Sequence, residues 1–237
     1  MQNRCGGRKT REQVTNRRVP QLGYYLIITD TNKTEENYLL GLRDSIPHHL
    51  QGKLVIKVRK TATQELVNEA LDQASIQPQY CEPWIVFDRD QVTDFDKIIS
   101  QAQKNEVHVG WSNPCIEIWF HAYWHTMPVY SGSVACCSGF AREYQKQTGQ
   151  KYEKANPSIY AKLCEFGNED AAIQLASSKL DQHKQNCKQK PSEMCPCTTL
   201  HQLISEIKGK IEHKATVESD VADAAAPFYA QNDGCSL

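Results

Sequence analysis

The sequence predicts an α/β fold, in which a four-stranded parallel sheet is flanked by helices and followed by a C-terminal helical extension. In the first half of the chain, short apolar runs that suit buried strands alternate with segments of helical periodicity. The connections between these segments are short, which favours parallel pairing through right-handed crossovers. Beyond about residue 130 the strand signals end and only helical segments follow.

The predicted strands are apolar runs, either continuous or alternating. YYLIIT and WIVF are continuous and typical of strands buried on both faces, whereas KLVIKV alternates. The strands are residues 24–29, 53–58, 84–87 and 106–111. The accompanying helices are residues 33–45, 63–74, 95–104 and a fourth that starts at Asn113-Pro114, where Asn suits the N-cap and Pro the first helical position. Helices of the extension are expected at residues 142–148, 159–166, 170–183 and 198–213.

Composition indicates a soluble globular protein with one large domain or two small ones. The chain has 237 residues, of which 40% are hydrophobic and 23% charged, and a formal net charge of −1, which excludes a histone-like basic protein. No apolar run approaches the roughly 20 residues that span a bilayer, so no membrane association is expected. The polar, basic N-terminus lacks the apolar stretch of a secretory signal, which predicts a cytoplasmic protein.

The ten cysteines are expected to be thiols in a reducing cytoplasm. No CxxC pair is present, and the closest pairs are Cys136-Cys137 and Cys195-Pro-Cys197. A structural zinc site normally shows two properly spaced ligand pairs. The spacing therefore favours buried or incidental thiols over zinc.

Charge is uneven along the chain. Residues 1–21 carry six basic residues and one acidic residue, which suits either a solvated arm or a contact with phosphates. Residues 215–237 carry four acidic residues and no basic one, in an Ala-rich segment that predicts a flexible tail. The expected organisation is a basic arm (1–21), an α/β core (22–128), a helical extension (129–213) and an acidic tail (214–237).

Acidic residues follow three of the four predicted strands. Asp30 follows the first strand, Asp88-Arg89-Asp90 the third, and Glu117 lies one turn into the helix after the fourth. Ligands of open parallel sheets bind at the carboxyl ends of the strands, so these carboxylates are expected to converge on Mg²⁺, which prefers oxygen ligands. On an extended strand exit Asp88 and Asp90 point to one side. The alternative for this motif is an ordinary helix-capping turn.

The segment CIEIWFHAYWH predicts an apolar helix buried between layers. Glu117 within it should be partnered, by a metal or a basic residue, because a lone buried carboxylate is costly. His121 and His125 are four residues apart, and without an HExxH sequence they are expected to be core or substrate-contacting side chains rather than zinc ligands. The chain lacks GxxxxGK[ST], GxGxxG after the first strand, and GxSxG.

Several segments, in order, resemble the RloB-like family, which belongs with the TOPRIM-type nucleases. YYLIITDTNKTEENYL is similar to the family pattern IIVCEGxxTExxYF, WIVFDRD to VVFDRDD, and SNPCIEIWFHAYW to SNPCFELWLLLHF. YEKANPSIYAKL resembles the Tyr-x-Lys helical segment of the family, and CPCTTLHQLISEI resembles its closing helix. The resemblance covers roughly residues 8–212.

The resemblance implies a TOPRIM-like core and a Mg²⁺-dependent or Mn²⁺-dependent enzyme that cleaves phosphodiester bonds in prokaryotic anti-phage defence, including abortive infection, often with a partner ATPase. It places catalytic roles, by motif position, on Asp30, Glu35, Asp88, Asp90 and Glu117, and metal binding on all of these except Glu35. The residues expected to contact nucleic acid are Arg17, Arg18, Lys33, Thr34, Arg89, Asn113, His121 and His125.

Asp30 departs from the family, which has Glu at that position. Its carboxylate is one methylene shorter, so the alternative function is a catalytically weakened nucleic-acid-binding or sensing subunit of a defence complex. Cleavage at phosphates reads little of the base, so DNA and RNA both remain candidate substrates. A partner protein and an oligomeric state are both compatible with the sequence.

Overall fold

The computed structural model describes residues 23–29, 33–58, 63–76, 82–90 and 92–225. The chain divides into a unit Gly23–Glu206, which holds the sheet and the helices around it, and a second unit that includes the chain from Ile207 onward. No described helix is both long enough and apolar enough to cross a membrane.

The central element is a sheet of five strands in the order β2-β1-β3-β4-β5. The strands are β1 (Tyr25–Thr29), β2 (Leu54–Val58), β3 (Glu82–Asp88), β4 (His108–Asn113) and β5 (Cys197–Thr198). The first four pair in parallel, as predicted, and β5 pairs antiparallel with β4. The prediction of four strands is wrong because it lacks β5, whose two residues are too few to show a strand periodicity.

The helices agree with the predicted segments in order but differ at several ends. They are α2 (Thr34–Ser45), α3 (His48–Gln51), η1 (Thr63–Glu65), α4 (Leu66–Ile76), α5 (Phe95–Lys104), α6 (Glu117–Ala122), α7 (Ser133–Thr148), α8 (Ile159–Phe166), α9 (Glu169–Gln185), η2 (Pro191–Glu193) and α10 (Leu200–Ala225). The segment expected to be a tail from residue 214 thus begins as helix, in keeping with its Ala content.

The helix predicted to start at Asn113-Pro114 starts later. Asn113 ends β4, the Asn113-Pro114 peptide is cis, and α6 begins at Glu117. The Asn113 amide donates to the carbonyls of Pro191 and Ser192, both at 3.2 Å. The side chain is therefore used to join β4 to η2, and it does not cap a helix.

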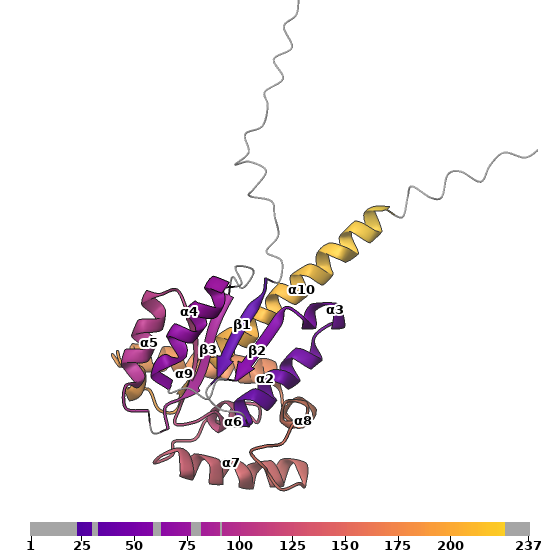
Figure 1. Cartoon of the computed structure of the whole chain (residues 1–237). Coiled ribbons are helices and arrows are strands. Elements are labelled where there is room, and N and C mark those ends of the chain that lie inside the picture. The colour runs from indigo at the N-terminus through magenta and orange to yellow at the C-terminus, as the bar shows by residue number, and fades with distance from the viewer. Residues whose placement is uncertain (1–22, 30–32, 59–62, 77–81, 91, 226–237) are drawn as a thin grey trace, which may run out of the picture. The chain divides into compact units, whose positions relative to one another are not determined.

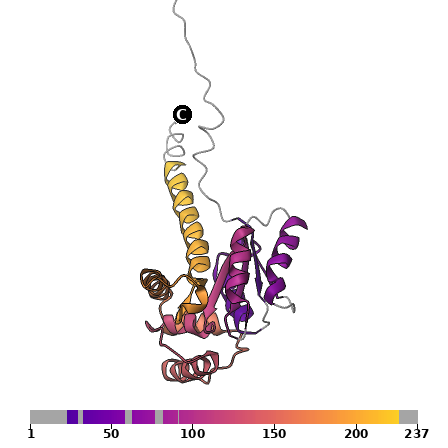
Figure 2. The ribbon, with the colours of Figure 1, turned by 90° about the vertical axis from the view of Figure 1, so that its left-hand side faces the viewer.

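Helices cover both faces of the sheet. Because right-handed crossovers run to opposite sides of β1, α2 lies on one face, while α4 and α5 lie on the other. Figure 2 shows the first turns of α10, in orange to yellow, on the side of the sheet opposite α4. There Leu200 packs against Gly110 of β4. The α4 and α5 face buries a continuous apolar core, which includes Leu26, Ile28, Leu66, Val67, Ile85, Phe87, Phe95 and Ile98.

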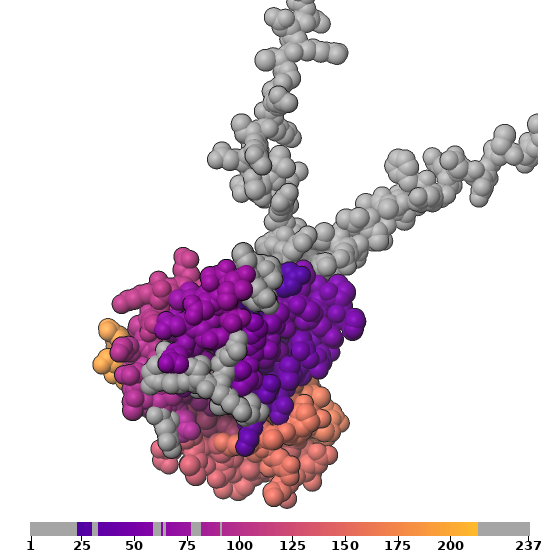
Figure 3. Space-filling model, in the orientation of Figure 1, coloured from indigo at the N-terminus to yellow at the C-terminus, as the bar shows by residue number. Residues whose placement is uncertain are grey.

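The helical extension packs directly on the α/β core. α6 and α7 lie beyond the carboxyl ends of the parallel strands (Figure 1). α8 contacts α2, and the space-filling view shows this part of the extension, in orange tones, directly below the indigo α2 (Figure 3). The carboxyl edge of the sheet is therefore covered by segments from both halves of the chain.

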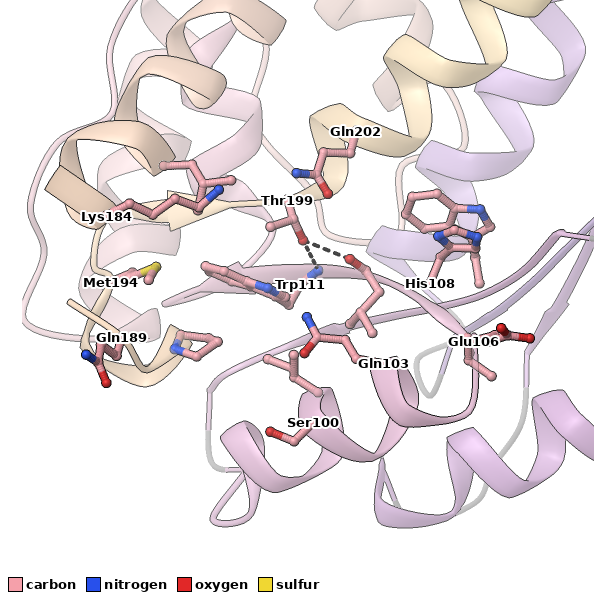
Figure 4. A pocket seen from close by; sticks show the side chains of 16 residues that line it. Ser100, Gln103, Glu106, His108, Trp111, Lys184, Gln189, Met194, Thr199 and Gln202 are labelled. Carbon is pink, nitrogen blue, oxygen red and sulfur yellow. Dashed lines mark hydrogen bonds between the residues drawn. The ribbon is translucent and has the colours of Figure 1, made fainter. Parts of the chain in front are cut away.

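Thr199 completes the hydrogen bonding of β4 next to β5. Its hydroxyl accepts from the backbone N–H of Trp111 at 3.0 Å and donates to the carbonyl of Val109 at 2.9 Å, and its own N–H donates to the Trp111 carbonyl (Figure 4). One side chain thus replaces the neighbouring strand that this edge of β4 lacks.

Replacing Thr199 with Val is expected to destabilise the protein by about 1–3 kcal/mol, because the isosteric change leaves the buried N–H of Trp111 and the half-buried carbonyl of Val109 without this partner. The measurement is denaturant unfolding followed by circular dichroism. Thr199→Ser is the matched control, since it keeps the hydroxyl and loses one methyl group, worth about 0.8 kcal/mol. Equal losses in the two variants would show that the hydroxyl does not hold this edge.

Candidate functional site

The strand order creates a switch point between β1 and β3. From β1 the chain crosses to β2 on one side and then returns past β1 to β3 on the other. In open parallel sheets, the crevice outside the carboxyl ends of two such strands is the usual ligand site. β1 ends at the buried Thr29, opposite Val86, and β3 continues two residues further to Asp88. The predicted ligand Asp30 lies outside the described residues.

Three carboxyl groups meet at this end of the sheet. Asp88 ends β3, Glu35 lies in the first turn of α2, and Glu117 is the first residue of α6. Glu35 and Glu117 are 5% and 1% exposed. Burial, followed by the charges of Glu35 and Glu117, raises the pKa of Asp88 well above its ordinary value, although the N–H of Ile116 opposes the shift. These three residues are the carboxyl cluster.

Hydrogen bonds and one cation hold the carboxyl cluster in place. Asp88 Oδ2 accepts from the N–H of Ile116 at 2.9 Å, which joins the end of β3 to the start of α6. The hydroxyl of Tyr152 donates to Glu117 Oε1 at 3.1 Å, and Lys154 Nζ lies 3.9 Å from the same oxygen. Burial lowers the pKa of Lys154, but the carboxylate of Glu117 and then the neighbouring Cys137 and Cys115 together outweigh burial and raise the pKa to about 12. Of the two kinds of partner expected for Glu117, a metal or a basic residue, the structure shows a basic residue beside it.

Arg89 and Asp90 are exposed and line a groove of about 650 Å³. The other walls are Asn113, Pro114 and the segment before and at the start of α7. The N–H of Asp90 donates to the Pro114 carbonyl at 3.1 Å, and the Ser133 hydroxyl donates to the Asp90 carboxylate. The prediction of an extended exit through Asp90 is wrong, because β3 ends at Asp88 and Asp90 lies in a turn.

Three of the residues expected to contact nucleic acid differ in exposure. Lys33 is exposed just before α2. Thr34 is buried, and its hydroxyl donates to the Lys154 carbonyl at 3.1 Å, so it positions the segment that carries Lys154. Asn113 is fully buried, and among the described residues its Oδ1 has no hydrogen-bond partner. Arg17 and Arg18 lie outside the described part of the chain.

The two histidines do not share a helix face, contrary to the sequence spacing. α6 ends at Ala122, and His125 follows it, exposed, with φ 61°. His121 is buried, and its Nε2 is hydrogen-bonded with the Tyr130 hydroxyl at 3.2 Å. Burial lowers the pKa of His121 from 6.5 to about 4, against the charges of Glu143 and Glu117. His121 is therefore a neutral core side chain.

The buried His121 is expected to make stability depend on acid. Its folded pKa lies below its unfolded pKa, so its contribution is present above about pH 6.5 and is lost as the pH falls to about 4. His121→Gln should flatten the pH dependence of the unfolding free energy across this window, by up to about 3 kcal/mol. His125→Gln is the exposed control. Parallel curves for wild type and His121→Gln would contradict a neutral His121.

One potential set of ligands was not predicted from the sequence. Within the described residues, Cys115, Glu117 and Cys137 place their ligand atoms within 4.8 Å of one another. The Sγ atoms of Cys115 and Cys137 are 3.9 Å apart. Cys115 precedes α6 and Cys137 lies in α7, so the whole of α6 and the segment after it separate them, and no short sequence motif contains both. The carboxyl cluster and this thiol pair share Glu117.

A larger cavity of about 730 Å³ lies elsewhere, beside the edge of β4. Figure 4 shows Trp111, Thr199, Lys184 and Gln202 around it, with His108 at one side. None of the sequence-predicted site residues lines it. The described site residues predicted from the sequence therefore lie at the carboxyl cluster, along the groove lined by Arg89 and Asp90 (the Asp90 groove) or near them, and not at the larger cavity.

Comparison with known proteins identifies a family. No curated protein and no solved structure shows significant similarity to the chain. The family model described as RloB-like protein matches residues 25–207, a range that contains the whole carboxyl cluster, the Asp90 groove and the Tyr152–Lys154 segment. The chain therefore belongs to the RloB-like protein family.

Proposed function

We propose that the protein is a metal-dependent nuclease that hydrolyses phosphodiester bonds of DNA or RNA. The observation that carries the proposal is the carboxyl cluster at the β1–β3 switch point, where three acids from three elements face one another. Burial and then the charges of Glu35 and Glu117 raise the pKa of Asp88, and a bound divalent cation would favour its ionised form. The donor set of carboxylate oxygens fits Mg²⁺ or Mn²⁺.

The residues have distinct roles in this proposal. Asp88 and Glu117 would hold the cation, together with Asp30 and Asp90 from the flanking turns. Such a cation supplies charge stabilisation at the phosphate and lowers the pKa of bound water. Glu35, which faces Asp88, would accept the proton of the attacking water. Lys154 and Tyr152 orient the Glu117 carboxylate through the contacts already described.

The Asp90 groove is the proposed path of the nucleic-acid backbone. It begins next to Asp88 in the chain and offers the exposed guanidinium of Arg89. The N-terminal end of α7 lines the same groove, and helix N-termini favour anions such as phosphates. These contacts would position the backbone without reading the bases. His121 and Asn113 are buried and would act through the surrounding structure.

The family resemblance supports a wider proposal, that the enzyme acts in the cytoplasm of a prokaryote during anti-phage defence. A partner ATPase or another protein of the defence system would then control it. Oligomerisation is compatible with this arrangement. A nuclease of this kind must be restrained until infection, so a purified chain assayed alone tests the chemistry separately from its control.

The first test is cleavage of plasmid, single-stranded DNA, tRNA and messenger RNA with Mg²⁺, Mn²⁺ or EDTA. Cleavage that needs the metal supports the proposal and identifies the substrate class. Binding of nucleic acid without cleavage in every metal would instead favour the sensing subunit. In that case Asp30→Glu, which restores the family residue, is the next variant, and continued inactivity would leave the binding function.

A further inference from the structure

Two cysteines from different elements lie against the carboxyl cluster. Cys115 is buried between β4 and α6, and Cys137 is half-buried in the second turn of α7. Their Sγ atoms are 3.9 Å apart, and an oxygen of the Glu117 carboxylate lies within 4.8 Å of both. The thiol pair is thus a three-donor site, in which the third donor belongs to the carboxyl cluster.

The spacing of these atoms suits a tetrahedral cation. Two thiolates bound to Zn²⁺ at about 2.3 Å with tetrahedral angles are about 3.8 Å apart, which agrees with the observed separation of the two Sγ atoms. A disulfide would need about 2.0 Å. A carboxylate oxygen at about 2.0 Å from the same Zn²⁺ would lie about 3.5 Å from each sulfur, within the range that the three residues already span.

The chemistry of the donors distinguishes this site from the carboxyl cluster. Thiolates bind borderline-soft cations such as Zn²⁺ and are poor ligands for Mg²⁺. Three protein ligands leave a fourth position for water or another ligand, which is the pattern of zinc sites that are not purely structural. The ammonium of Lys154 lies 3.9 Å from the Glu117 carboxylate, where a bound cation would repel it. The Lys154 side chain is 59% exposed and can turn to solvent when a cation binds.

We propose that Cys115, Cys137 and Glu117 form a binding site for Zn²⁺ or a similar thiolate-binding divalent cation. The site needs no assumption about cleavage. One consequence, which rests on the proposed function, is that Zn²⁺ would compete with Mg²⁺ for Glu117 and so inhibit the nuclease.

The test uses the full-length, metal-free protein and Co²⁺ as a spectroscopic probe of zinc sites. The expected result is a thiolate-to-cobalt charge-transfer band in the near ultraviolet, which Zn²⁺ abolishes by displacing Co²⁺. Cys115→Ser and Cys137→Ser should each lower the intensity of the band by at least half, and the double variant should remove it; each should weaken Zn²⁺ binding by more than the roughly 10–100-fold that loss of an outer-shell partner costs. Cys187→Ser, at an exposed cysteine, is the matched control and should retain both.

A second measurement needs no variant and so does not depend on how the substituted proteins fold. Zn²⁺ should protect the half-buried Cys137 of the wild-type protein from alkylation by iodoacetamide, as read by mass spectrometry, and should leave the exposed Cys187 reactive. Absence of a thiolate band, a band of wild-type intensity in both single serine variants, or alkylation of Cys137 unchanged by Zn²⁺ would overturn the site. None of these readouts uses cleavage, so failure here is distinguishable from failure of the nuclease.

Discussion

Asp88→Asn is expected to reduce metal-dependent cleavage by about 10³-fold or more, because Asp88 is the acid that joins Glu35 and Glu117 in one cluster. The metal contributes several kcal/mol of transition-state stabilisation, and about 4 kcal/mol corresponds to 10³ in rate. An Asn oxygen can still accept the hydrogen bond from Ile116, so the start of α6 should be preserved. The measurement is the initial rate on the substrate that wild type cuts best.

Asp94→Asn is the matched control for this variant. Asp94 is exposed at the start of α5, and its side chain makes no capping hydrogen bond there. It should cleave at the wild-type rate. If Asp88→Asn also kept the wild-type rate, the carboxyl cluster would not be the catalytic site, and any cleavage seen would have to arise elsewhere in the protein.

The same variant is expected to make the metal-free protein more stable at neutral pH. The folded pKa of Asp88 is raised above its unfolded value, so the contribution of Asp88 to stability is largest at low pH and is lost as the pH rises from about 4 through the folded pKa. Asn does not ionise and avoids this loss. One unit of pKa shift corresponds to about 1.4 kcal/mol, and for a chain of this size each kcal/mol moves Tm by roughly 2–4 °C.

Mg²⁺ should make wild type more stable than Asp88→Asn, which reverses the order of stability expected without metal. A cation that binds only the folded state at 100 times its dissociation constant stabilises it by about 2.7 kcal/mol. Wild type should therefore gain Tm on addition of Mg²⁺, whereas Asp88→Asn should gain little. The measurement is thermal unfolding of both proteins and of Asp94→Asn, in EDTA and in Mg²⁺, at pH 5 and pH 8. A lower Tm for Asp88→Asn in EDTA at pH 8 would show that the cluster is not under repulsion.

The parallel part of the sheet was predictable because its strands are buried on both faces. Such strands are short apolar runs that stand out from amphipathic helices, and β1, β2, β3 and β4 all overlap predicted runs, although β3 is longer and β4 begins and ends two residues later than predicted. β5 was not predictable, since Cys197 and Thr198 pair only because Thr199 and η2 bring them to the edge of β4. The periodicity of a short segment indicates which of its residues are buried. It does not indicate pairing with a strand that is far away in the sequence.

The candidate site divides in the same way. The sequence shows that acidic residues follow the strands. Because β3 and β4 are parallel, Asp88 and Glu117 lie at the same edge of the sheet. The backbone predicted from the sequence is wrong at two points. Asn113 ends β4 and does not cap a helix, and His125 follows the end of α6 and does not lie within it. In both places a side chain that suits a local motif is used by the tertiary structure in another way.

By itself, the sequence determined the order of the elements, the edge of the sheet at which acids gather, and the family motifs that carry them. The tertiary structure alone decided which groups touch: Tyr152 and Lys154 against Glu117, and Cys115 against Cys137. The physical reason is that strand and helix patterns arise from burial within a few residues, whereas these contacts join segments 22 to 37 residues apart and depend on the path of the backbone between them.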